Sequence, residues 1–327
     1  MTIKEALESG RLPNVDAVLW VRESIIASGS AAGTRAIDVA AWDGIACRIY
    51  PDRGLDVGQA WYGGIPLAWV SRVGESPPLS TLEGMAWGDA FGGGLVTTCG
   101  LRNVGMPSEG HGLHGTYSHL PARDVAVTRN VENNGASISV TGTVRDEGPP
   151  AFIVRRTIRI CAGVGMIQIE DHTVNSGATP EAAPLLYHFN FGYPLWAPPA
   201  HLEIPVERTV ARDAASEVAL GFWHQPPEIA VGPERVLEHD LGDAGEGFAR
   251  IVNQQVGLSM TLRWNRAALP RLNQWLDPNP GMGVLGVEPA NCSTRGRAAD
   301  RQSGTLPALG PGETRTTRVS LEISPVV

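Results

Sequence analysis

Several features that mark other protein classes are scarce or missing in this sequence of 327 residues. Basic residues number 26 against 34 acidic ones, the formal net charge is −8, and the basic residues are scattered. Without a basic surface to attract a phosphate backbone, nucleic acid is not expected as a partner. No run of about 18 apolar residues is present, so neither a transmembrane helix nor a membrane partner is expected.

The four cysteines form none of the usual motifs. They are Cys47, Cys99, Cys161 and Cys292, and no two of them make a CxxC pair. Neither a disulfide framework nor a zinc knot is indicated, and we expect buried free thiols. Residues 1–10 carry charged side chains where a secretory signal needs an apolar stretch, which predicts a cytoplasmic location.

Glycine and proline are abundant, and they separate short alternating runs. The chain has 39 glycines and 25 prolines between segments in which apolar and polar residues alternate, the period of a β-strand. Residues 125–131 and 136–144 flank Asn134-Gly135, a pair that favours a tight turn, and predict a hairpin. Residues 153–160 and 166–174 predict the neighbouring hairpin. Further strands are expected over residues 18–27, 36–41, 45–50, 55–61, 248–253, 258–263, 283–287 and 315–323.

Helix signals are few. Thr2 followed by Glu5 has the pattern of a capping box and predicts a short helix within an N-terminal extension at about residues 1–12. No internal repeat, charge block or linker marks a domain boundary. With 43% hydrophobic and 18% charged residues, the chain can fill a large core. We therefore expect residues 1–327 to form a single all-β domain, a large antiparallel β-sandwich.

Charged and imidazole side chains concentrate in the glycine-rich segment 92–121. They include Arg102, Glu109, His111, His114 and His119. Glycine lets a ligand approach the backbone, and imidazole can hydrogen-bond, bind a metal or move a proton. A solvent-exposed loop with no chemical role is the alternative explanation of this composition.

Two further segments bring polar groups into strand-like sequence. In residues 185–196, His188 and Asn190 are two apart and point to one face of a strand, while aromatic residues point to the other. Glu288 closes an apolar run just before Pro289, where partial desolvation raises a carboxyl pKa and makes a better base near neutral pH. A buried core histidine and a salt-bridged structural glutamate are the alternatives.

The order of these motifs resembles that of the aldose 1-epimerase (galactose mutarotase-like) family, in particular its uncharacterised epimerase-like bacterial branch (DUF4432-like). Arg102 in CGLRNVG and His114 in LHG resemble the family's arginine and first histidine. His188 in YHFNFG resembles its second histidine, and Glu288 in GVEP resembles its C-terminal glutamate. The likeness extends over most of the chain from about Asp52 onward.

The resemblance implies a galactose mutarotase-like fold and a reaction at the anomeric carbon of a small sugar or sugar derivative. Glu288 would take the proton of the anomeric hydroxyl while His188 protonates the ring oxygen, so that the ring opens and recloses as the other anomer. Because only protons move, neither a cofactor nor a metal is expected. The residues expected to bind the sugar are Arg53, Asp56, Arg102, His111, His114, Asn190 and Trp275.

Alternatives stay open at this point. Arg53 and Asp56 lie in DRGLDVGQAWYGG, which resembles a signature of the same branch, and an ion pair that stabilises a turn explains them equally well. The histidine cluster would also suit a metal-dependent sugar isomerase or lyase whose ligands come from Glu109 to His119. A non-catalytic carbohydrate-binding protein is the third possibility. The sugar's identity and the oligomeric state are not encoded in these motifs.

Overall fold

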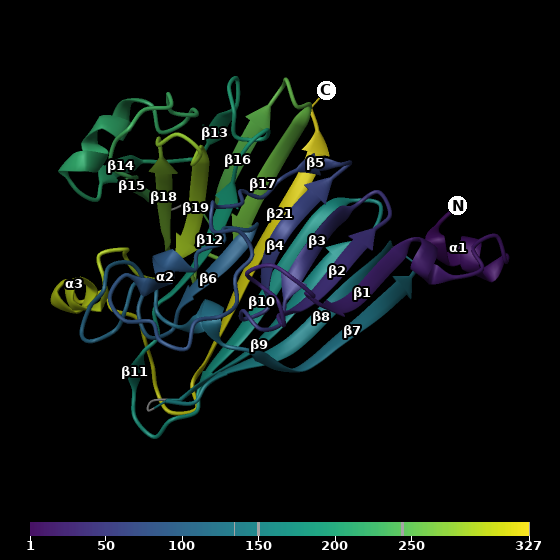
Figure 1. Ribbon diagram of the computed structural model, residues 1–327, viewed down its shortest axis with the longest axis horizontal. Helices are drawn as coiled ribbons and strands as arrows, with labels where there is room; N and C mark the ends of the chain where they lie inside the picture. Colours follow the sequence, from purple (N-terminus) through teal and green to yellow (C-terminus); the bar gives the residue numbers. More distant parts are fainter. Residues whose placement is uncertain (134, 149–150, 243–244, 327) are drawn as a thin grey trace.

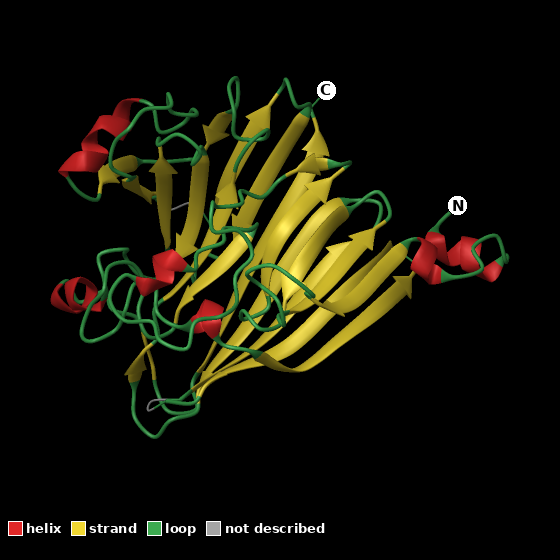
Figure 2. Ribbon diagram, in the orientation of Figure 1, coloured by secondary structure: helices red, strands yellow, loops and turns green. Residues whose placement is uncertain are grey.

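The computed structural model describes residues 1–133, 135–148, 151–242 and 245–326, and most of their regular structure is β-strand (Figure 2). Two large antiparallel sheets pack face to face, which confirms the expected all-β sandwich (Figure 1). The helices lie outside the sheets and are short: α1 (Ile3–Glu8), α2 (Ala86–Asp89), α3 (Arg297–Gln302) and the 3-10 turns Val15–Ala17, Tyr117–His119 and Ala214–Gly221. None of the helices in the described ranges is long and apolar enough to span a bilayer.

The first sheet has eleven strands in the order β1-β2-β3-β4-β6-β12-β19-β18-β15-β14, with β5 paired to β4. Its strands are β1 (Leu19–Ile25), β2 (Arg35–Ala41), β3 (Ile45–Tyr50), β4 (Asp56–Tyr62), β5 (Ile65–Pro66), β6 (Val96–Gly100), β12 (Leu185–Phe191), β14 (Arg208–Ala211), β15 (Arg235–Asp240), β18 (Arg271–Asp277) and β19 (Val284–Ala290). Its centre therefore joins strands that are far apart in sequence, β6, β12 and β19 (Figure 1).

The second sheet has eight strands in the order β13-β16-β17-β21-β10-β9-β8-β7. They are β13 (His201–Glu203), β16 (Gly247–Asn253), β17 (Leu258–Trp264), β21 (Thr314–Pro325), β10 (Gly165–Asn175), β9 (Phe152–Cys161), β8 (Gly135–Asp146) and β7 (Ala122–Glu132). A small two-stranded sheet pairs β11 (Glu181–Ala182) with β20 (Ala308–Leu309). Both predicted hairpins are confirmed as β7-β8 and β9-β10, whereas Asn134 lies outside the described residues.

The predicted strands are all present, with ends that differ by a few residues, and residues 45–50 match β3 fully. Five strands of the first sheet had no prediction: β5, β6, β14, β15 and β18. All five residues of β6 are buried, as are the five central residues of β18. A strand covered on both faces has no apolar-polar alternation to detect.

The N-terminal helix also follows the sequence prediction. The Thr2 hydroxyl accepts a hydrogen bond from the Glu5 backbone amide at 3.1 Å, and the Glu5 carboxylate accepts one from the Thr2 amide at 2.8 Å. This completed capping box starts α1. The cysteines are free thiols as expected, although Cys161 is only partly buried.

A continuous apolar core fills the space between the sheets, and one charged cluster is embedded in it. Arg156 on β9 is fully buried and pairs with Asp171 at 2.7 Å and with Asp56 at 3.0 Å. The Tyr187 hydroxyl of β12 donates to Asp171 at 2.5 Å. Buried charges are tolerated when they are paired and hydrogen-bonded, and this cluster ties β4 and β12 of one sheet to β9 and β10 of the other.

Strand β12 separates this core from a second buried region. All seven of its residues are buried, because the core covers one face and the loops around α2 lie over the other (Figure 1). Residues of alternate positions, His188 among them, point away from the core toward those loops. The outer face of β12 and its neighbours therefore forms the floor of an enclosed site.

Candidate active site

His188 and Glu288 are brought together by the pairing of β12 with β19. Phe189 of β12 is in register with Val287 of β19, so the flanking residues His188 and Glu288 lie next to each other on the outer face. The distance between His188 Nε2 and Glu288 Oε1 is 3.1 Å. The side chains are only 5% and 3% exposed, which makes this contact almost dry.

The pair lies in a cavity of about 360 Å³. That volume lies within the range of sites that hold small organic ligands. The cavity wall includes Trp69, Arg72, Trp87, Phe91, Leu113, His114, Arg212, Glu234, Trp275, Asp277, Met282 and Thr294. A larger groove of about 520 Å³ crosses the outer face of the other sheet, but the residues that line it include neither His188 nor Glu288.

Glycine at position 286 leaves room for the pair. A Cβ atom there would lie 2.7 Å from Glu288 Oε1 and 2.9 Å from Trp275 Cβ. Both distances are below ordinary van der Waals contact, so any larger residue would displace the glutamate or the tryptophan. The absence of a side chain at position 286 thus allows Glu288 and Trp275 to take their places.

Several buried polar atoms at this site have no hydrogen-bond partner among the described residues. They are His188 Nδ1, Glu288 Oε1, Thr294 Oγ1 and Asn273 Nδ2. The Nε2–Oε1 contact is short, but it does not have hydrogen-bond geometry. Asn273 is paired in register with Glu288, directly opposite it on β18. Because unpartnered buried polar atoms are costly, their concentration here marks a place where a polar ligand or water can bind.

Burial moves the pKa values of the pair in opposite directions. Desolvation raises the pKa of Glu288 to about 8, and the nearby Glu234 carboxylate adds to the increase while Arg212 opposes it. Desolvation lowers the pKa of His188 to about 4. At neutral pH the pair therefore carries one exchangeable proton, which resides on Glu288. This is contrary to the sequence expectation of an ionised glutamate and a protonated histidine, because desolvation penalises the charged form of each group.

Aromatic rings enclose His188. Its ring centroid is 5.2 Å from that of Phe91, 5.4 Å from that of Trp275 and 5.8 Å from that of His114. Trp87 lies behind these rings, with its centroid 4.6 Å from those of both Phe91 and His114. The rings exclude water from the pair, which is the physical origin of its shifted pKa values.

His114 reaches the cavity from the glycine-rich segment. Its backbone has a φ of 55°, in the left-handed region, and its Nδ1 accepts a hydrogen bond from the Gly105 amide at 3.3 Å. Burial lowers the pKa of His114 to about 3, so the ring is neutral and Nε2 carries its proton. His114 therefore supplies a neutral hydrogen-bond donor beside the pair.

Comparison with known proteins agrees with this architecture. The family model described as Domain of unknown function (DUF4432) matches residues 31–323. The chain belongs to this family. No curated protein matches it.

Solved structures show that the DUF4432 chain has a galactose mutarotase-like fold. A candidate aldose 1-epimerase from Klebsiella pneumoniae superposes with a TM-score of 0.83 at 19% identity, over 93% of this chain and 83% of the other. A galactose mutarotase-like protein from Clostridium acetobutylicum gives 0.64 at 16%, over 95% and 100%. Galactose 1-epimerase from Lactobacillus acidophilus gives 0.61 at 13%, over 94% and 100%.

Of the sequence-predicted residues, the structure gathers His188, Glu288, His114 and Trp275 in the cavity. Trp275 lies on β18, and its indole N–H donates to Glu234 at 3.0 Å. The four residues come from four separate segments of this DUF4432 protein. Strand pairing in the first sheet brings His188, Glu288 and Trp275 together, and His114 joins them from the loop after β6.

Arg53 and Asp56 lie elsewhere. Asp56 is held by Arg156 in the core, and Arg53 donates to backbone carbonyls of Ser76 and Ala90. The hollow beside them measures about 40 Å³, too small for a sugar. Both residues have structural contacts, but not those of the expected ion pair with each other: Arg53 holds the loop next to Phe91, and Asp56 pairs with Arg156.

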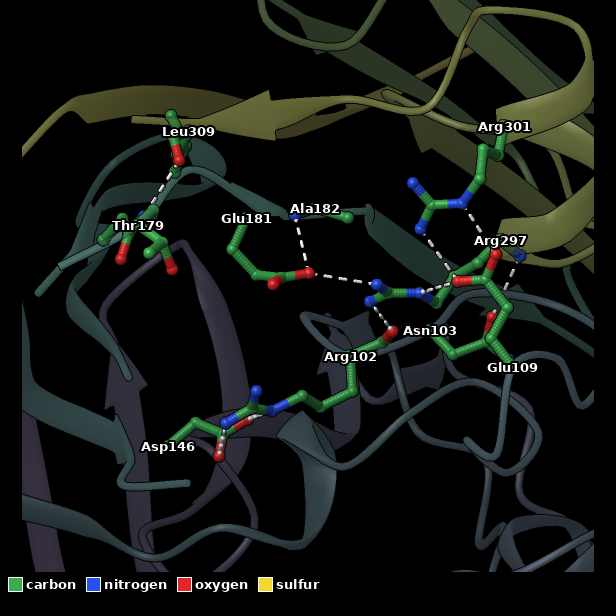
Figure 3. A network of polar contacts seen from close by, with 11 residues as sticks. Arg102, Asn103, Glu109, Asp146, Thr179, Glu181, Ala182, Arg297, Arg301 and Leu309 are labelled. Atoms are coloured by element: carbon green, nitrogen blue, oxygen red, sulfur yellow. Dashed lines mark hydrogen bonds and ion pairs between the residues drawn. The ribbon is translucent and has the colours of Figure 1, made fainter. Parts of the chain in front are cut away.

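Arg102 and His111 are also outside the cavity wall. The guanidinium of Arg102 bonds to Asp146, with Nε 2.6 Å from the carboxylate, and to the Gly148 carbonyl (Figure 3). His111 belongs to a tight turn closed by hydrogen bonds with Ser108. Because Arg102 lies outside the cavity wall and its Nε and Nη2 donors are bound to Asp146 and Gly148, its placement does not favour sugar binding.

Asn190 supports the site from within the sheet. It is fully buried, and its amide donates to the carbonyls of Gly94 at 3.0 Å and His188 at 2.9 Å. It is not part of the cavity wall. Its contacts fix the backbone on which His188 stands.

The histidine-rich segment does not assemble a metal site in the part of the chain that the structure describes. Glu109 is engaged by Arg301 at 2.8 Å and by Arg297 at 3.0 Å, and the bonds to Arg301 lower its pKa to about 2 (Figure 3). His119 Nδ1 accepts from the Leu79 amide. Glu109 and His119, two of the ligands expected in the metal-dependent alternative, are thus bound to different protein groups.

Several cavity residues were missed by the sequence analysis. Trp69, Trp87 and Phe91 come from the loops before β6, while Arg212 and Glu234 flank a segment of low sequence regularity. The one available signal was the presence of three large aromatic residues in a loop rich in glycine and proline, where solvent exposure would be costly. No motif pointed to Arg212 or Glu234.

Proposed function

We propose that this protein is an isomerase of the aldose 1-epimerase type, which interconverts the two anomers of a small sugar. The observation that carries the proposal is the His188–Glu288 pair, an acid and a base 3.1 Å apart on the floor of a sugar-sized cavity. The names of the solved structures with the same fold agree with it. The chain is at most 19% identical in sequence to those proteins, so the proposal rests on the local geometry of the site.

The pair has the groups that ring opening requires. One member accepts the proton of the anomeric hydroxyl while the other donates a proton to the ring oxygen. The bond between C1 and the ring oxygen breaks, its electrons go to that oxygen, and a carbonyl forms at C1. Rotation about the C1–C2 bond and closure on the other face reverse both transfers. Protons balance over the cycle, and each acid or base contributes about 10²- to 10⁴-fold to the rate.

Neighbouring groups would orient the sugar. His114 offers a neutral donor, and Thr294 offers a hydroxyl whose oxygen has no partner among the described residues. Trp275 presents its ring, because its N–H is bound to Glu234. An aromatic face suits the apolar C–H edge of a pyranose.

The mechanism predicts the pH dependence of activity. Turnover requires the pair to hold one proton, a state that extends from the lower pKa of about 4 to the upper pKa of about 8. Below this window the pair is doubly protonated and has no base, and above it the pair has no acid. A bell-shaped profile with limbs near those values is therefore expected when kcat/KM is measured across pH.

The decisive experiment is NMR saturation exchange between anomers over a panel of sugars. The native protein should accelerate exchange above the buffer rate, and Glu288→Gln should abolish the acceleration because an amide cannot carry the proton. Glu238→Gln is the matched control, since Glu238 lies on β15 in an ion pair with Arg295 and outside the cavity wall. Sugar binding without accelerated exchange would contradict the proposal and favour a binding protein. Activity lost to a chelator and restored by a metal would favour the metal-dependent alternative.

A further inference from the structure

We propose, on the basis of the function proposed above, that the sugar taken by this cavity is a deoxy sugar: an aldose with a methyl or methylene group where common hexoses carry a hydroxyl. The cavity is divided into a polar end at the His188–Glu288 pair and an aromatic wall. The division decides which parts of a sugar can be buried there.

The tryptophans of the wall offer only carbon surface to a ligand, because each has its single polar group bonded within the protein. The indole N–H of Trp69 donates to the Met282 carbonyl at 2.6 Å, and that of Trp275 donates to Glu234 at 3.0 Å. The N–H of Trp87 donates to the Ser118 hydroxyl at 3.0 Å. None of the three indole N–H groups is therefore free to donate a hydrogen bond to a sugar hydroxyl.

The rings form one continuous wall. The ring centroids of Trp69, Phe91 and Trp275 are 5.7 to 6.1 Å apart, the spacing of rings in contact. Val236 and Met282 extend this apolar surface. A hydroxyl pressed against it would lose its water without gaining a partner.

Polar atoms available to a ligand gather on the cavity floor. Within the described residues, the buried unpartnered atoms on the cavity wall belong to His188, Glu288 and Thr294. They are suited to the anomeric hydroxyl and the ring oxygen. The sugar's anomeric side therefore faces polar groups, and the rest of its ring faces the wall.

Arg212, Glu234 and Asp277 of the cavity wall already have hydrogen-bond partners within the protein. Arg212 donates to Asp213 at 2.8 Å and to Glu234 at 3.1 Å, while Asp277 accepts two hydrogen bonds from Asn279. A hydroxyl near the rim can also keep its water. The position that must lack a hydroxyl is thus the one buried against the aromatic wall.

A hydrophobic surface rejects an added hydroxyl by up to about 10²-fold. We therefore expect kcat/KM for anomer exchange to be about ten- to a hundredfold higher for the deoxy member of at least one matched pair. The pairs are galactose with 6-deoxygalactose, glucose with 6-deoxyglucose, and ribose with 2-deoxyribose. Each rate is corrected for the spontaneous exchange of the same sugar.

Phe91→Tyr tests the cause of the preference, because it adds one hydroxyl to the wall with little change in shape. The ratio of deoxy to parent sugar should fall several-fold in this variant. Phe248→Tyr is the matched control, since Phe248 lies on β16 of the other sheet against Arg263 and should leave the ratio unchanged.

The outcomes separate the two proposals. No exchange with any sugar would overturn the proposed function itself. Exchange that favours the parent sugar in all three pairs, or treats the members alike, would overturn the substrate class alone. A deoxy preference that Phe91→Tyr leaves untouched would remove the aromatic wall as its origin and overturn the inference as argued.

Discussion

Adjacent residues of β12 enter two buried polar regions that are built in different ways. Tyr187 points into the core, where Arg156 is paired with both Asp171 and Asp56. His188 points into the cavity, where its Nδ1 has no hydrogen-bond partner among the described residues. Burial alone would lower the pKa of Arg156, but the charges of Asp171 and Asp56 raise it well above its usual value.

The difference separates polar groups that stabilise the fold from polar groups that are available for chemistry. In the core each charged group meets an opposite charge, and these pairs connect the two sheets. In the cavity the carboxyl and imidazole groups meet mainly aromatic carbon, so both are neutral and their unsatisfied atoms await a ligand. Complete pairing stabilises the fold, whereas incomplete pairing leaves the carboxyl and imidazole groups free to exchange protons. Variants on the two faces should therefore fail in different ways.

The largest effect is expected for His188→Asn, which removes one proton-transfer group from the cavity. The rate of anomer exchange should fall by about 10²- to 10⁴-fold. The free energy of unfolding should change by less than about 1 kcal/mol, because the ring has few hydrogen bonds to lose. Exchange NMR and urea unfolding measure the two quantities on the same preparation.

His239→Asn is the control for that variant. His239 is a buried histidine of β15 whose ring nitrogens bond to Gln274 and Thr209, both at 2.9 Å. Its replacement should cost about 1–3 kcal/mol of stability and leave exchange intact. If both histidine variants lost stability and activity together, the division between the two kinds of polar group would be wrong.

Arg156→Met breaks the core cluster and should destabilise the protein strongly. Removing one partner of a buried ion pair leaves uncompensated carboxylates, at a cost of about 3–5 kcal/mol. Arg318→Met is the control, because its ion pair with Glu170 is on the surface and should contribute no more than about 1 kcal/mol. Urea unfolding of both variants checks the contrast. Equal, small changes would mean that the core pairs contribute little.

Much of the fold could be predicted, because a strand with one buried and one exposed face shows an alternation of apolar and polar residues. The hairpins β7-β8 and β9-β10 have one face in the core and one in solvent, and both were found. Strands β6 and β18, covered on both faces by the core and the cavity loops, gave no such signal. Two strands beside the site, β6 and β18, were thus missed by periodicity, whereas β19 was predicted.

The site residues that could be predicted from the sequence are those that lie on strands and belong to a recognisable motif. His188 and Glu288 meet because β12 pairs with β19, and both belonged to recognised motifs. Arg102 shared that support, yet Asp146, distant in sequence, binds its guanidinium. Long-range partners of this kind are invisible to local sequence patterns, as were the loop residues Trp69 and Phe91, which approach the cavity only after folding.

A smaller effect is expected for Tyr187→Phe. Tyr187 directly precedes His188, and its side chain lies on the opposite face of β12. Its hydroxyl is 2.5 Å from Asp171 and 2.6 Å from Thr317, and losing these bonds should cost about 2 kcal/mol. Exchange activity should be retained. Tyr193→Phe, at an 81% exposed residue, should change neither quantity. A loss of rate in Tyr187→Phe at full stability would show that the two faces are coupled.

The smallest effect concerns the pH dependence of stability, and it comes from the proton held in the cavity. Glu288 has a pKa of about 8 in the folded state, against an ordinary value of 4.5 for a glutamate. Between pH 6.5 and 8 the folded protein therefore binds a proton that the unfolded chain has released. Folding stability should fall as pH rises through this window, by about 1 kcal/mol per pH unit for one proton.

Glu288→Gln removes that proton from the balance, so the variant should gain stability relative to the native protein as pH rises from 6.5 to 8. His188 and His114 do not disturb the comparison, because burial lowers their pKa values to about 4 and 3 and they are neutral throughout the window when folded. Urea unfolding at four pH values gives the difference directly. Parallel curves for the two proteins would mean that the pair holds no extra proton at neutral pH, and the acid needed for ring opening would then be missing from the resting site.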